Sequence, residues 1–167
     1  MGRRLWHRMP WLAIGLVGAM MSAALLAGIE GEISANIAVA YFIPGIVYLA
    51  DAVGTQTETL AIRGLSVGAG IGRVAGREAA TGLLVGLLLA AAMLPTITLL
   101  WHDVALAATV SIAVLAASTL ATMVAMALPY LLYRLGYDPA LGSGPLATVV
   151  QDLLSIVIYL GAVRLIL

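Results

Sequence analysis

The chain has 167 residues, of which 63% are apolar and only 10% are charged, and its mean hydropathy is +1.11. A soluble domain of this length carries about 25% charged residues, so the composition excludes a water-soluble globular fold, and the high hydropathy excludes disorder. The zero formal net charge gives no argument for a nucleic-acid partner, and the lack of cysteine excludes disulfides and thiolate metal sites. Because the apolar blocks are long and lack the dyad alternation of a β-barrel, we expect an all-α membrane protein.

Five blocks are long enough to cross a bilayer, which requires roughly 20 apolar residues. We expect transmembrane helices at about residues 10–29, 37–62, 80–100, 104–133 and 145–167. Together they form a single transmembrane domain over residues 1–167. Pro145 suits the first turn of the fifth helix, where no amide hydrogen is needed. A signal peptide over residues 1–29 is the weaker interpretation, because the apolar stretch is long and no clear A-x-A site follows it.

The charges between the blocks indicate an orientation. One side collects most of the arginines, namely Arg3, Arg4, Arg8, Arg63, Arg73, Arg77 and Arg134. The other side holds Glu30, Glu32, His102 and Asp103, with Arg164 near it. The positive-inside rule then predicts a multi-pass protein of the plasma or inner membrane, with the N-terminus cytoplasmic and, after five spans, the C-terminus outside. The connections are short, so we expect no soluble regulatory domain in this chain.

Three acids lie inside the expected spans, where charge is costly and is therefore typical of function. They are Asp51, Glu58 and Asp152. Asp51, Thr55 and Glu58 follow i, i+4, i+7 spacing, which places them along one stripe of the second helix. A stripe of oxygen ligands suits a hard cation such as Mg²⁺ or Ca²⁺. The alternative is a buried acid paired with an arginine, and Arg63 is such a partner for Glu58.

A second polar stripe follows the last helix. Thr148, Asp152 and Ser155 have the same i, i+4, i+7 spacing on an otherwise apolar segment. We expect Asp152 to be the functional acid of this stripe. The sequence carries no GxSxG, HExxH or P-loop motif, so we do not expect an enzyme. An aspartyl pair of Asp51 and Asp152 is the remaining enzymatic alternative.

Two stretches resemble the membrane domain of the MgtE family of magnesium channels and transporters. The first runs from Pro44 through Gly54, Gln56 and Thr59 to Arg63-Gly64-Leu65, and the second reads Asp138-Pro139-Ala140, Ser143-Gly144-Pro145, Thr148 and Asp152. Arg77-Glu78 resembles the Arg-Glu pair that opens the family's third helix. The resemblance implies a homodimer with a cation pore on the two-fold axis. It also implies that the second and fifth helices line this pore and that Asp152 is its central ion-site residue.

The chain also departs from the family pattern. Most members read Gly-Gly-Asn-x-Gly in the second helix, whereas this chain reads Ala50-Asp51-Ala52-Val53-Gly54. Asp51 and Glu58 are therefore extra acids in a segment that is usually neutral. The family's cytoplasmic N domain and paired CBS domains are not found in the sequence, so the chain resembles a stand-alone membrane domain.

We therefore expect a divalent cation channel or transporter in the lipid bilayer, with Mg²⁺ as the foremost ion and other divalent cations open. The expected metal-binding residues are Asp152, Asp51, Thr148, Glu58, Thr55 and Ser155. One alternative is a secondary transporter of another solute, coupled to a cation or a proton through the extra acids. The other is a helical membrane scaffold that transports nothing.

Overall fold

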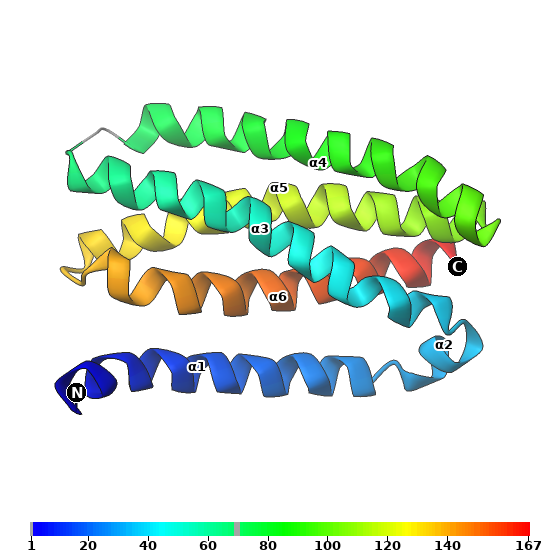
Figure 1. Ribbon diagram of the computed structural model, residues 1–167, viewed down its shortest axis with the longest axis horizontal. Helices are drawn as coiled ribbons and strands as arrows, with labels where there is room; N and C mark the ends of the chain where they lie inside the picture. Colours follow the sequence, from blue (N-terminus) through cyan, green and yellow to red (C-terminus); the bar gives the residue numbers. More distant parts are fainter. Residues whose placement is uncertain (1, 69–70) are drawn as a thin grey trace.

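The computed structural model describes residues 2–68 and 71–167, with the backbone alone for several of them, among them Arg3, Arg4, Glu32 and Arg73. The side chains of these four, which entered the orientation argument, lie outside the described residues. The helices are α1 (Gly2–Ala27), α2 (Glu30–Ala35), α3 (Ala38–Ser66), α4 (Ile71–Trp101), α5 (Val104–Arg134) and α6 (Pro139–Ile166) (Figure 1). Within the described residues, five of these helices are long and apolar enough to cross a membrane. The all-α fold with five membrane spans is thus confirmed.

The helix ends differ from the ranges expected from hydropathy. α6 begins at Pro139 rather than Pro145, because Asp138 caps it by accepting a 3.0 Å hydrogen bond from the Ala140 amide. Pro139 thereby takes the first helical position, and Pro145 lies inside the helix. α4 begins at Ile71, well before residue 80, because Arg77, Glu78 and the alanines beside them favour a helix beyond the apolar span, although Gly72 and Gly76 disfavour it. The first connection forms α2, a short helix of its own.

Both ends of α5 are fixed by local hydrogen bonds. Asp103 accepts a 2.9 Å hydrogen bond from the Leu106 amide at the start of the helix. At the other end the Tyr137 amide donates to the Leu132 carbonyl, and the Gly136 amide donates to that of Tyr133. Gly136 has a φ of +79°, so the chain reverses there in a Schellman motif that a side chain at this position would strain.

α5 is the central helix of the bundle. It packs against α3, α4 and α6, and residues along its whole length are buried. The core cluster around it includes Ile46, Ile97, Val110, Val114 and Tyr159. The Tyr159 hydroxyl donates a 2.9 Å hydrogen bond to the Val39 carbonyl, which ties α6 to the first turn of α3. The polar tip of this buried side chain is therefore satisfied inside the apolar core.

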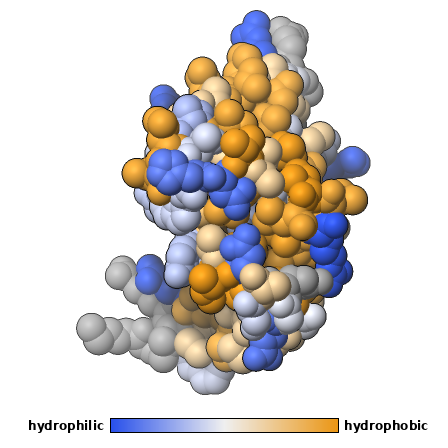
Figure 2. Space-filling view, turned by 90° about the vertical axis from the view of Figure 1, so that its right-hand side faces the viewer, coloured by the Kyte–Doolittle hydropathy of each residue, from blue (hydrophilic) through white to orange (hydrophobic). Residues whose placement is uncertain are grey.

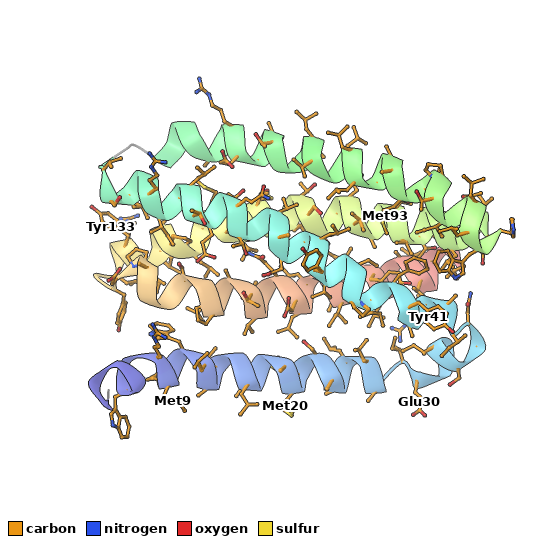
Figure 3. All side chains as sticks on the ribbon, in the orientation of Figure 1. Met9, Met20, Glu30, Tyr41, Met93 and Tyr133 are labelled. Atoms are coloured by element: carbon orange, nitrogen blue, oxygen red, sulfur yellow. The ribbon has the colours of Figure 1, made fainter. Side chains whose placement is uncertain are left out.

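α1 lies at the edge of the bundle and packs mainly against α6 (Figure 1). A Cβ at Gly18 would lie 3.1 Å from the Val149 Cβ, so this glycine lets the two helices approach closely. On the outer side of α1, Met9 and Met20 are about half exposed or more, at 48% and 60% (Figure 3). Among the described side chains, α1 is therefore held mainly by α6, and much of its outer surface is exposed.

The two ends of the bundle differ in charge. The N-terminus and the α3–α4 and α5–α6 connections share one end, and α2, the α4–α5 connection and the C-terminus share the other (Figure 1). Glu30 and Tyr133, labelled in Figure 3, mark these opposite ends. Figure 2 looks onto the α2 end, where hydrophilic side chains gather among apolar ones. Of the arginines with described side chains, Arg8, Arg63, Arg77 and Arg134 belong to the first end, the arginine-rich end.

The close packing of α4 on α5 yields a first prediction. A Cβ at Gly82 would lie 2.8 Å from the Thr122 Cβ, so Gly82→Ala must push the two helices apart. Overpacking of this kind costs about 1–3 kcal/mol. We expect a lower melting temperature for the purified variant in detergent. The melting is measured by the loss of helical circular dichroism on heating.

Gly76→Ala is the matched control, because it makes the same change on the same helix with nothing within 4 Å of the new Cβ. It should leave the melting temperature unchanged or raise it, since alanine favours the helix. Equal effects of the two substitutions would contradict close packing at Gly82.

Candidate functional site

A groove lies between α1, α3 and α6 and brings two acids together. Its volume is about 620 Å³, and the residues that line it include Asp51 from α3 and Thr148 and Asp152 from α6. Asp51 and Asp152 are 101 positions apart in the sequence, yet both reach this groove. The structure thereby joins one aspartate from each of the two polar stripes.

Direct and electrostatic contacts link these residues. The Thr148 hydroxyl donates a 3.3 Å hydrogen bond to Asp51 Oδ1, across the α3–α6 interface. The carboxyl groups of Asp51 and Asp152 also interact electrostatically with each other. Both aspartates are half-buried and Thr148 is exposed, so the carboxylates stay accessible from the groove. Two like charges at one surface attract a cation and repel an anion.

The groove continues toward the arginine-rich end. A second hollow of about 340 Å³ shares Ala19, Thr148 and Asp152 with it and reaches Pro145 and Leu12. On the α1 side the two hollows meet small residues, including Gly15, Ala19 and Ser22. Asp152 therefore lies where the two hollows join, with room for water on both sides of its carboxylate.

One chain supplies too few ligands to enclose an ion. Among the described side chains, no group of three or more His, Asp or Glu residues could hold a metal. Mg²⁺ requires six oxygen ligands and keeps several of its waters. Asp51, Thr148 and Asp152 can therefore contact a hydrated cation or supply part of its shell. The remaining oxygens must come from water or from another chain.

Glu58 lies apart from the groove, although it shares the predicted stripe of α3 with Asp51. It is only 7% exposed, and its Oε1 is 2.5 Å from the Ser143 hydroxyl of α6. Ser143 also lies 2.6 Å from the Pro139 carbonyl, so its single hydrogen serves either acceptor. The sequence alone offered Arg63 as a partner for Glu58, but the described partner is Ser143.

Thr55 and Ser155 are also separated from the two acids. Thr55 is exposed, and its carbonyl accepts a hydrogen bond from the Thr59 hydroxyl. Ser155 is 1% exposed and lies inside the helix packing. α3 runs obliquely across α6, so a straight stripe on either helix leaves the groove after one or two turns (Figure 1). Thr55, Glu58 and Ser155 remain predicted metal-binding residues that the groove does not include.

Gln151 is a residue that sequence patterns did not single out. Its side chain is 2% exposed, and its Oε1 has no hydrogen-bond partner among the described residues. A Cβ at Gly54 would lie 2.7 Å from the Gln151 Cδ, so α3 has a glycine where the amide of α6 packs against it. The sequence indicated Gln151 only indirectly, because it is a polar residue next to Asp152 that faces a glycine on the neighbouring helix.

A second interhelical pair joins α3 to α4. The Thr57 hydroxyl donates a 3.2 Å hydrogen bond to Glu78 Oε2. Glu78 belongs to the Arg-Glu pair that opens the third long helix in the sequence. Its described role here is to tie α4 to α3 near the arginine-rich end, at a distance from the acid-lined groove.

Comparison with known proteins matches most of the chain to one family. The family model MgtE, described as "Divalent cation transporter", matches residues 43–162. This range contains α3 from its second turn, α4, α5 and most of α6, and it includes both groove acids.

Three curated relatives share this similarity, each named "Magnesium transporter MgtE". The protein from Enterococcus faecalis is 33% identical over 156 residues, which cover 91% of this chain and 34% of the relative. The Thermus thermophilus protein is 33% identical over 98% of this chain and 37% of its own length, and the Bacillus subtilis protein is 30% identical over 93% and 36%. The chain thus spans about a third of the length of these relatives.

The contact between Glu58 and Ser143 yields a second prediction. Ser143→Ala removes the described donor to a buried carboxyl group, and leaving such a group unpaired costs about 1–3 kcal/mol. We expect a lower melting temperature for this variant. Ser118→Ala is the matched control, because the Ser118 hydroxyl is equally buried but has no partner among the described residues. If both variants melt at the same temperature, the Glu58–Ser143 contact contributes no stability.

Proposed function

The chain belongs to the MgtE family of divalent cation transporters, and from this membership we propose that it moves a divalent cation, foremost Mg²⁺, across the membrane. One observation carries the proposal. Two helices of a membrane-spanning bundle bring Asp51 and Asp152 to a single open groove. An acid at bilayer depth is costly unless a partner offsets its charge, and a passing cation is such a partner. The proposed activity is ion movement and not catalysis.

We further propose that two copies of the chain enclose the ion path. One chain offers two groove carboxylates and one hydroxyl on a single open surface, so an ion bound by one copy would keep its waters on the other side and stay unenclosed. A two-fold axis facing the groove would double this set and place α3 and α6 of both copies around the ion. It would also remove the acids from contact with lipid. A parallel C2 homodimer is the simplest assembly that meets both needs.

Within this site we assign Asp152 the central role, because it lies where the two hollows join. Asp51 and Thr148 support it from the same surface. A hydrated Mg²⁺ is bound through its water shell, so the site needs charge at a distance more than close ligands. Two pairs of carboxylates facing the axis provide that charge. A bound cation relieves the repulsion between them.

For orientation we propose that the arginine-rich end faces the cytoplasm. Arg8, Arg63, Arg77 and Arg134 support this, because positive residues near short connections stay on the cytoplasmic side. The N-terminus would then lie inside, and the C-terminus would lie outside. Cysteine substitutions at either end, labelled by an impermeant reagent on intact cells, test this arrangement.

The experiment that tests the transport proposal is ion flux into liposomes that hold the purified protein alone. Mg²⁺, Ca²⁺, Mn²⁺ and Na⁺ are compared, and a pH-sensitive dye records proton movement in the same vesicles. We expect divalent cations to enter in preference to Na⁺ with no proton flux. Uptake of another solute that dissipates a pH gradient would favour a coupled transporter. The absence of any flux would favour a scaffold.

Asp152 provides the third prediction. Asp152→Asn keeps the shape but removes the charge, so Mg²⁺ affinity should fall by about 1–3 kcal/mol, the scale of one charged hydrogen bond. We expect slower Mg²⁺ flux and a much smaller rise of the melting temperature on adding Mg²⁺, which protects the wild type by mass action. Asp51→Asn should weaken flux in the same direction.

Asp103→Asn is the control for these variants. It makes the same change at a helix cap, where asparagine serves as well as aspartate, and it lies outside the groove. It should keep the flux and the Mg²⁺ protection of the wild type. An Asp152→Asn protein that also keeps both would exclude Asp152 as the central residue.

The assembly provides the fourth prediction. We expect the purified protein in mild detergent to have the mass of two chains, by light scattering corrected for bound detergent. A groove-facing cross-link offers a second measurement, because Ser22→Cys would pair across the proposed axis if α1 of both copies flank it. A purely monomeric mass together with full flux activity would contradict the shared ion path.

A further inference from the structure

A separate cavity lies on another part of the bundle, between α4 and α5. Its volume is about 260 Å³, and the residues that line it include Ala75 and Ala79 from α4 and Thr122, Met123, Met126 and Tyr130 from α5. It shares no lining residue with the acid-lined groove. α4 and α1 lie at opposite edges of the bundle, so this cavity also faces away from α1 (Figure 1).

The shape of the cavity follows from how α4 packs on α5. Gly82 and Gly86 let α4 approach Thr122 and Leu115 of α5 closely. Toward the arginine-rich end, the small side chains of Ala75 and Ala79 leave space between the helices. The close contact at Gly82 therefore forms the inner limit of the cavity.

The lining fits an apolar ligand. Met126 is 6% exposed and Met123 is 53% exposed, so the cavity runs from the protein interior to the surface. The Thr122 hydroxyl already donates to the Thr119 carbonyl and offers no free hydrogen. Methionine side chains adapt to irregular apolar ligands. An acyl chain is the apolar ligand that surrounds a membrane-spanning helix on every side.

A positively charged side chain lies at the outer end of the α5 face that lines the cavity. Met123, Met126, Tyr130 and Arg134 follow helical spacing along one face of α5. The Arg134 guanidinium lies 5.9 Å from the centre of the Tyr130 ring, and Arg134 is exposed. Tyr130 is itself a lining residue, so the charge lies beside the mouth of the cavity.

The depth of the cavity matches one leaflet of a bilayer. Ala75 and Arg134 are end residues of their candidate spans, which places them near the headgroups. The twelve residue steps from Arg134 back to Thr122 extend about 18 Å along the helix. One leaflet has about 15 Å of hydrocarbon, half of the bilayer core. A lipid with its headgroup at Arg134 would thus reach the inner limit of the cavity with its acyl chain.

We propose that this cavity binds one acyl chain of an anionic phospholipid, whose phosphate contacts Arg134 in the leaflet at the arginine-rich end. The apolar lining holds the chain, and the guanidinium selects the charge of the headgroup. Arginine suits this role because its planar guanidinium binds phosphate oxygens through two hydrogen bonds at once. The site is independent of the ion that the groove carries.

Lipid retention tests the proposal. The full chain, purified in detergent and stripped of lipid, is incubated with dioleoylphosphatidylglycerol or with dioleoylphosphatidylcholine, and bound lipid is counted by native mass spectrometry. We expect the anionic lipid to be retained about fivefold more, the scale of one arginine's attraction to an anionic headgroup. Soluble glycerol 3-phosphate, the third arm, should bind no better than buffer, because it lacks the acyl chain.

Two variants separate the parts of the site. Arg134→Gln should abolish the preference for the anionic lipid while neutral lipid binding stays the same. Ala79→Leu should fill the cavity and reduce retention of both lipids. Arg8→Gln is the control, because Arg8 is an exposed arginine on α1, away from the cavity. It should retain both lipids like the wild type.

The proposal is overturned if the wild type retains both lipids equally, or if Arg134→Gln keeps the full preference. It is also overturned if glycerol 3-phosphate alone competes for the site. Arg134 is exposed, so its replacement leaves the helix packing intact, and the test stands even if Ala79→Leu does not fold.

Discussion

The hydrocarbon core of a bilayer cannot solvate a carboxylate, and the arrangement of this bundle depends on that constraint. Asp51 and Asp152 cannot be covered by apolar helices without a partner, so the packing leaves them at an open groove. α5 makes this possible, because it supplies an apolar core on which α3 and α6 rest without contributing a charge to the groove. α1 then contacts α6 at the rim and does not cover the acids.

Hydropathy alone predicts the five membrane spans, because a bilayer requires long apolar helices and imposes little else. It does not predict α2 or the early start of α4, since both depend on polar residues at the ends of the bundle. Helical spacing identifies the faces of α3 and α6 that carry Asp51 and Asp152, but it assigns Glu58 and Ser155 to the same faces. The oblique crossing of α3 and α6 separates Glu58 and Ser155 from the groove. A pattern within one helix contains no information about the angle at which two helices cross.

The acid-lined groove and the cavity between α4 and α5 differ in the chemistry that they can hold. The groove beside α1 has two carboxylates and a hydroxyl, which suit a hydrated cation. The cavity between α4 and α5 has alanine and methionine walls with one arginine near its mouth. Because α5 packs against both α4 and α6, a change in the spacing of α4 and α5 would be transmitted to α6 through the same core.

The contact between Gly54 and Gln151 has a consequence for how this sequence can change over evolutionary time. A side chain at position 54 would overlap the Gln151 amide in its present position, so what position 54 accepts depends on the residue at 151. A larger residue at 54 becomes acceptable once the Gln151 amide has turned aside or has been replaced by a smaller side chain. Among homologues of this chain the two positions should therefore vary as a pair, and that paired variation would record the distance between α3 and α6 independently of any coordinates.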